Sequence, residues 1–112
     1  MNELKIFESK EFGKGRTVEV NGEPYFVGKD IATILGYRVT DKAVRDHVDS
    51  EDKLTDHFGG SGQMREMTII NESGLYSLIL SSKLPTAKQF KRWVTSEILP
   101  TIRKTGGYVN NT

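Results

Sequence analysis

The sequence predicts an α+β fold in which a small antiparallel sheet of hairpins is combined with about four helices. Two runs of β-branched and aromatic residues flank Asn21-Gly22, a strong hairpin signal because both turn positions require φ > 0. Apolar residues recur at helical spacing in later segments. We therefore expect a helix-turn-helix-like unit near residues 30–48, a second hairpin, and a long kinked C-terminal helix.

Three short strands are expected first. Leu4–Phe7 is the first, and Thr17–Val20 and Tyr25–Val27 flank the Asn-Gly turn. Pro24 has no N–H to give to a sheet, so it places its strand at a sheet edge or at the start of the strand.

Two short helices follow. The first opens at Asp30 or at the residue before it, and Gly36 supplies its left-handed stop. Thr40 is expected to cap the second, which runs from Asp41 to about Val48. The inward-pointing residues of this second helix are Ala43, Val44 and Val48.

In a helix-turn-helix the second helix presents its polar face to DNA, which here means Lys42 and Arg45, with Arg38 in the turn. Two short helices joined by a glycine turn also occur in many domains that bind no nucleic acid. Three carboxylates nearby would repel phosphates: Asp41, Asp46 and Asp49. Both interpretations remain open at this point.

The middle of the chain predicts an acidic loop, a hairpin and a third helix. Residues 49–52 form the loop, and strands Lys53–Phe58 and Met64–Ile70 enclose a glycine-rich tip that we expect to be mobile. Asn71 or Ser73 begins the third helix. Its inward residues are Leu75, Leu78 and Ile79.

The last helix is expected to start at Pro85, to kink or break at Pro100 and to end at Gly106-Gly107. Its apolar stripe comprises Ala87, Phe90, Val94 and Ile98, with Trp93 beside it. A second stripe is cationic and comprises Lys88, Lys91 and Arg92, with Lys83 just upstream. Several cations on one face can neutralise several phosphates, although an ordinary amphipathic helix has the same pattern.

Composition narrows the class of protein. The chain has 112 residues and no cysteine, so it is the size of one domain and contains no disulfide or cysteine nucleophile. The net charge of +1 divides into −4 over residues 1–82 and +5 over residues 83–112, which favours an anionic partner for the C-terminal part. No signal peptide and no membrane span is visible, so we expect a cytoplasmic protein.

Signals of catalysis are poor. The two histidines, His47 and His57, lie on different predicted elements, and no phosphate-binding P-loop or metal-ligand spacing occurs. We therefore expect no enzyme activity, no cofactor and no metal.

Several motifs, in this order and spacing, resemble the Bro-N domain of phage antirepressors and baculovirus-repeated-ORF proteins. They are the run from Asn21 to Ala32, Leu35-Gly36-Tyr37, the run from Ile70 to Tyr76, Phe90 to Val94, and Leu99 to Tyr108. The resemblance implies a DNA-binding domain over residues 4–108, with 109–112 a tail or the start of a linker to a further domain. It also implies a regulator of the lysogenic/lytic switch in the host-cell cytoplasm.

Two functions follow as hypotheses. The first is binding of double-stranded DNA through Arg38, Lys42, Arg45, Lys83, Lys88, Lys91 and Arg92. The second is a protein-interaction module that binds a phage repressor or forms a homodimer, with Trp93, Phe90 and Tyr76 as a possible seam. The glycine-rich hairpin is where we expect family members to differ.

Overall fold

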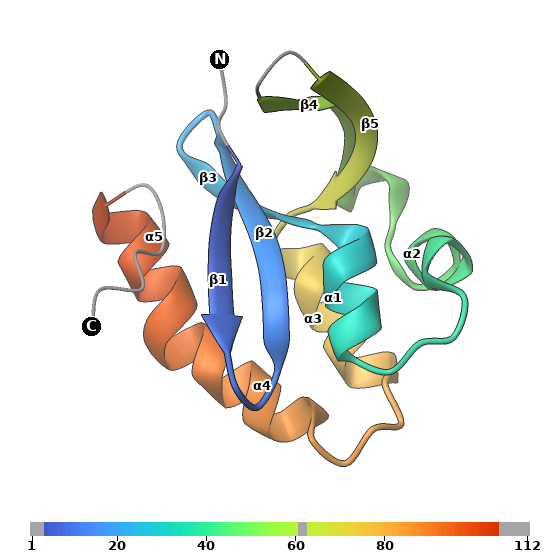
Figure 1. Ribbon diagram of the computed structural model, residues 1–112. Coiled ribbons are helices and arrows are strands. Elements are labelled where there is room, and N and C mark those ends of the chain that lie inside the picture. The colour runs from blue at the N-terminus through green and yellow to red at the C-terminus, as the bar shows by residue number, and fades with distance from the viewer. Residues whose placement is uncertain (1–3, 61–62, 106–112) are drawn as a thin grey trace.

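A computed structural model describes residues 4–60 and 63–105 as a sheet with helices packed on it (Figure 1). The α+β prediction is confirmed. The elements are β1 (Lys5–Ser9), β2 (Gly13–Val20), β3 (Glu23–Val27), α1 (Gly28–Ile34), α2 (Thr40–His47), β4 (Lys53–Gly60), β5 (Gln63–Ile70), α3 (Glu72–Ser81), α4 (Ala87–Trp93) and α5 (Leu99–Thr105).

The five strands form one antiparallel sheet in the order β1-β2-β3-β5-β4. The predicted Asn-Gly hairpin is confirmed, because Asn21 and Gly22 have φ values of 51° and 83°. Pro24 lies at the start of β3, one of its two predicted placements, and β5 pairs with this strand only further along, at Phe26 and Val27.

The β4–β5 hairpin extends beyond the rest of the sheet. β3 pairs with β5 only through Phe26↔Ile70 and Val27↔Ile69, whereas β4 and β5 pair along their whole length. The outer part of this hairpin is therefore a two-stranded ribbon, seen at the top of Figure 1. The predicted mobile tip falls partly on residues 61–62, which lie outside the described residues.

The sheet has an apolar cluster on each face. On one face, the fully buried Phe7, Phe26 and Ile70 join the helices in the main core. On the other, the cross-strand pairs Val18↔Tyr25 and Val27↔Ile69 form a smaller cluster. Helices α1, α3 and α4 thus all rest, directly or through one another, on a single sheet face.

Helices α1 and α2 form the predicted helix-turn-helix-like unit. Gly36 has φ 82° and stops α1, as expected. The prediction that Thr40 caps α2 is wrong. Val39 is the N-cap, its carbonyl accepts from the amide of Ala43, and no side chain caps the helix.

The acidic segment and the start of α3 are tied together. Residues Ser50–Asp52 form one 3₁₀ turn in the segment predicted as a loop. The Asp52 carbonyl accepts from the amide of Asn71, and the Asn71 side chain caps α3 by accepting from the Gly74 amide at 2.9 Å. Of the two predicted starts, Asn71 and Ser73, the structure confirms Asn71, which is the N-cap of α3.

The C-terminal helix is long and passes through Pro100. It begins at Ala87, two residues after the predicted start at Pro85. Between α4 and α5 the residues Val94–Ile98 form a π-helical turn, and the ribbon continues without a break (Figure 1). The interruption predicted at Pro100 thus takes the form of a wider turn just before a residue that cannot donate an N–H. The predicted end at Gly106-Gly107 lies outside the described residues.

Trp93 belongs to an aromatic cluster inside the domain. Its ring stacks on Phe12 with centroids 5.4 Å apart and meets Phe7 edge-on at 5.5 Å. Phe90 is 1% exposed and therefore cannot contribute to the predicted homodimer seam. Phe90 and Val94 are buried in the domain's own core, and the partly buried Trp93 packs against that core.

Candidate nucleic-acid interface

The exposed face of α4 carries an uncompensated row of cations. Lys88, Lys91 and Arg92 are spaced i, i+3, i+4, which aligns them on one stripe while Phe90 and Val94 are buried. No acidic residue occurs between Lys83 and Ser96. Among the residues that the structure describes, these cations form no ion pair, so their charge is available to a ligand.

Two loops extend this row toward α2. The Ser82 hydroxyl donates to the Leu35 carbonyl at 2.8 Å, and the Leu84 side chain lies against Gly36. Arg38 and Lys83, which are far apart in sequence, are exposed on these two adjoining loops. The structure thus brings the two predicted groups of cations onto neighbouring elements.

Helix α2 differs from α4 in its charge balance. Lys42 and Arg45 are exposed as predicted, but Asp46 accepts from Lys42 at 2.6 Å and lies 3.9 Å from Arg45. The hydrogen bond from Lys42 lowers the pKa of Asp46, and the charges of Lys42 and Arg45 act in the same direction. The helix therefore offers polar groups with little net charge.

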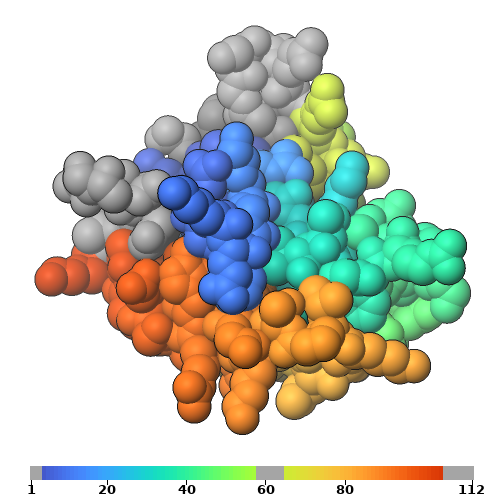
Figure 2. Space-filling view, turned by 60° about the horizontal axis from the view of Figure 1, so that its bottom comes forward, coloured from blue at the N-terminus to red at the C-terminus, as the bar shows by residue number. Residues whose placement is uncertain are grey.

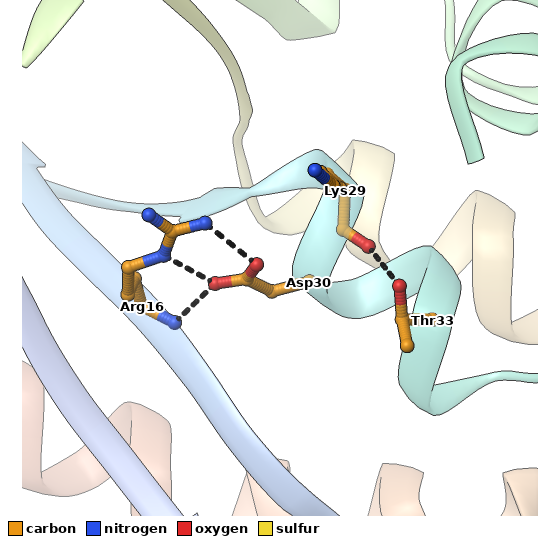
Figure 3. Close-up of polar contacts among 4 residues, drawn as sticks. All are labelled: Arg16, Lys29, Asp30 and Thr33. Carbon is orange, nitrogen blue, oxygen red and sulfur yellow. Dashed lines mark hydrogen bonds and ion pairs between the residues drawn. The ribbon is translucent and has the colours of Figure 1, made fainter. Parts of the chain in front are cut away.

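Helix α1 is fixed to the sheet by a bidentate ion pair (Figure 3). Arg16 of β2 donates from Nε and Nη2 to the two Asp30 oxygens at 2.8 and 2.9 Å, and its backbone amide also donates to Asp30 at 3.0 Å. Asp30 lies in the first turn of α1, where a negative charge is favourable. This pair holds the helix-turn-helix-like unit in place, and sequence analysis did not single out Arg16.

Both cationic elements are visible on one side of the molecule (Figure 2). The orange C-terminal helical segment crosses the lower half of that view, below the blue β1–β2 hairpin, and green α2 lies to its right. Helices α4 and α2 thus both reach this side of the molecule.

An apolar feature adjoins the cation row. Leu80, at the end of α3, is 79% exposed, while its neighbours Leu78 and Ile79 are buried. A hollow of about 180 Å³ lies between α3 and α4, lined by Tyr76, Ile79, Leu80 and Lys91. The sequence pattern indicated the buried residues of α3 but gave no signal for this site.

The remaining surface shows less specific chemistry. A larger hollow of about 370 Å³ between α2 and the β4–β5 ribbon has both Lys53 and Glu66 in its lining, so its charges are mixed. Within residues 4–60 and 63–105, no group of three or more His, Asp or Glu side chains could hold a metal ion. None of the helices described is long and apolar enough to cross a membrane.

Comparison with known proteins identifies the family. The model of the BRO family N-terminal domain, Bro-N, matches residues 14–100. An uncharacterized protein of Haemophilus influenzae is 38% identical over 106 residues, which cover 95% of this chain and 53% of that protein. Bro-N domain-containing protein 289L of Invertebrate iridescent virus 6 is 44% identical over 103 residues, covering 76% of this chain and 25% of that protein. No solved structure matches the chain significantly.

A further relative is the uncharacterized Bro-N domain-containing protein ORF2 of Autographa californica nuclear polyhedrosis virus, 33% identical over 128 residues, covering 96% of this chain and 39% of that protein. The chain thus spans about half, or less, of the length of these relatives. The family match covers most of the chain and agrees with the motifs quoted from the sequence. The chain therefore belongs to the BRO family, in which it corresponds to the N-terminal domain, Bro-N.

Proposed function

We propose that this Bro-N domain binds double-stranded DNA and acts, as part of an antirepressor, in the control of a lysogenic/lytic switch. The observation that carries the proposal is the row of Lys88, Lys91 and Arg92 on α4, with Lys83 nearby and no carboxylate between them. Such a row suits a polyanion with regularly spaced charges, and phosphate contacts supply most of the affinity of DNA-binding proteins.

In this proposal the two helices have different tasks. The α4 row holds the phosphate backbone, because its charges are uncompensated. Helix α2, whose cations are balanced by Asp46, contributes less to affinity and more to reading base edges through Lys42 and Arg45. The role is one of binding, without catalysis.

The test is a titration of a DNA duplex at several salt concentrations with wild-type protein and with the triple variant Lys88→Gln, Lys91→Gln, Arg92→Gln. The slope of log K against log salt changes by about 0.9 for each phosphate contact, so the triple variant should lose about 2.7 of it. The matched control is Lys5→Gln, Lys10→Gln, Lys14→Gln, which removes the same charge from the exposed side chains of the β1–β2 hairpin. Equal slopes for the two variants would contradict the proposed role of α4.

A second variant separates base reading from phosphate contact. If Arg45 reads a base edge, Arg45→Ala should reduce the preference at one base pair by about 1–3 kcal/mol. A uniform loss of affinity across all DNA sequences would make Arg45 a backbone contact instead.

The alternative function is capture of a phage repressor, or self-association, without DNA reading. The balanced charge of α2 and the mixed-charge hollow beside it favour a protein partner for that side. Sedimentation of the domain alone and with a purified phage repressor, followed by the same DNA titration, distinguishes the two. Repressor binding with no measurable DNA affinity at low salt would favour the alternative.

A further inference from the structure

The exposed side chain of Leu80 bears on sequence preference, a property that rests on the proposed function of DNA binding. Leu80 is the most exposed of the large apolar side chains in the described parts of the chain, at 79%. The nearby Leu84 is explained by its packing over Gly36, at 3.1 Å from where a Cβ would lie. Leu80, by contrast, belongs to neither apolar cluster of the described residues.

The surroundings of Leu80 indicate what would cover it. The shallow hollow that it lines is apolar on the α3 side and has Lys91 of the cation row on the α4 side. A ligand that fills this hollow must therefore present an anionic group and a small apolar group within reach of each other.

DNA presents that combination in its major groove, where the C5-methyl group of thymine lies on the groove floor and phosphates line the edge. We propose that Leu80 contacts thymine methyl groups while Lys91 and its neighbours hold the adjacent backbone. Leu80 is then a residue that determines sequence preference, and the preference is for thymine over the same base without its methyl group.

The hollow is small, and the charges beside it favour a nucleic acid over a protein partner. Its volume of about 180 Å³ lies below the range of about 300–1,000 Å³ typical of ligand pockets. The charges beside it on α4 are of one sign from Lys83 to Ser96, which complements a phosphate backbone.

The experiment uses thymine-to-uracil replacement, which removes only the methyl group. Duplexes that bind the wild-type domain are first enriched from a random-sequence pool, then synthesised with thymine or uracil at each position in turn. We expect at least one position at which uracil weakens binding about fourfold, the factor for burying one methyl-sized group. In Leu80→Ala this difference should fall to about onefold, while the salt slope stays that of wild type because no charge is removed.

The matched control is Ile6→Ala, since Ile6 is 55% exposed on β1 and does not line the hollow; it should keep the thymine preference. A melting curve verifies that both variants fold. An unenriched pool, equal affinity for thymine and uracil, or a preference that survives in Leu80→Ala would overturn the inference while leaving DNA binding intact. No binding to any duplex at low salt would instead overturn the proposed function itself.

Discussion

Replacement of Trp93 by alanine tests whether this side chain packs the C-terminal helix against the core or contacts DNA. Trp93 meets the rings of Phe7, Phe12 and Phe90, and its Nε1 donates to Glu97 Oε2 at 2.9 Å. The variant removes these ring contacts and opens a gap between β1, the β1–β2 turn and α4. We expect a loss of stability with DNA affinity preserved in the folded fraction.

The size of the loss follows from burial. Truncation of a buried Trp costs about 3–5 kcal/mol, and because Trp93 is only half-buried we expect about 3 kcal/mol. In a domain of about 100 residues each kcal/mol lowers the Tm by roughly 4 °C or more, so the Tm should fall by about 12 °C or more. The change is a large share of the 5–15 kcal/mol that is typical of small domains.

The assay is thermal unfolding followed by circular dichroism, with DNA binding measured well below both transitions. Glu97→Gln is the control, because its amide oxygen can still accept from Trp93 Nε1 and its Tm should change little. A Trp93→Ala variant as stable as wild type would refute the packing argument. If that stable variant also failed to bind DNA, Trp93 would be a contact residue.

Three further predictions concern stability. Arg16→Met should lower the free energy of unfolding in urea by about 1.5–3 kcal/mol, because it breaks charged hydrogen bonds to the largely buried Asp30. The control Lys42→Met breaks an exposed ion pair and should cost far less. Equal losses in the two variants would contradict this prediction. Gly74→Ala should lower the free energy of unfolding by about 1–3 kcal/mol despite the better helix propensity of alanine, because the added Cβ would lie 2.9 Å from Val48 Cγ1. A variant more stable than wild type would show that the site is not crowded. Burial raises the pKa of three tyrosine side chains. The stability that these neutral side chains contribute is therefore complete below a pH of about 10 and declines as the pH rises through their raised pKa values. An absorbance titration that follows the ionisation of these tyrosines checks this prediction. Ionisation at the same pH as free tyrosine would contradict it. The phenols are Tyr25, Tyr37 and Tyr76.

Features that depend only on residues close in sequence could be predicted from the sequence. The Asn21-Gly22 turn and the Gly36 stop need positive φ, which few residues other than glycine and asparagine adopt. The buried faces of α2, α3 and α4 follow from the helical period. Helix starts were less certain, as Thr40 and Pro85 illustrate, because a hydrogen bond or turn one or two residues away shifts the boundary.

The candidate site also has one feature that could be predicted from the sequence and one that could not. The stripe of Lys88, Lys91 and Arg92 could be predicted because an i, i+3, i+4 spacing aligns side chains in any α-helix. The position of Leu80 beside Lys91 could not be predicted, since it depends on how α3 packs against α4.

By itself, then, the sequence determined the local turns, the faces of the helices, the cationic C-terminal stripe and the family to which the chain belongs. Only the tertiary structure decided that β5 lies beside β3, that Arg16 forms an ion pair with Asp30, 14 positions away, and that the loops carrying Arg38 and Lys83 adjoin. The reason is physical: turns and helix faces are set by bonds and sterics within a few residues. Strand order and ion pairs between elements depend on which distant surfaces bury each other best, and that choice is made by the whole chain at once.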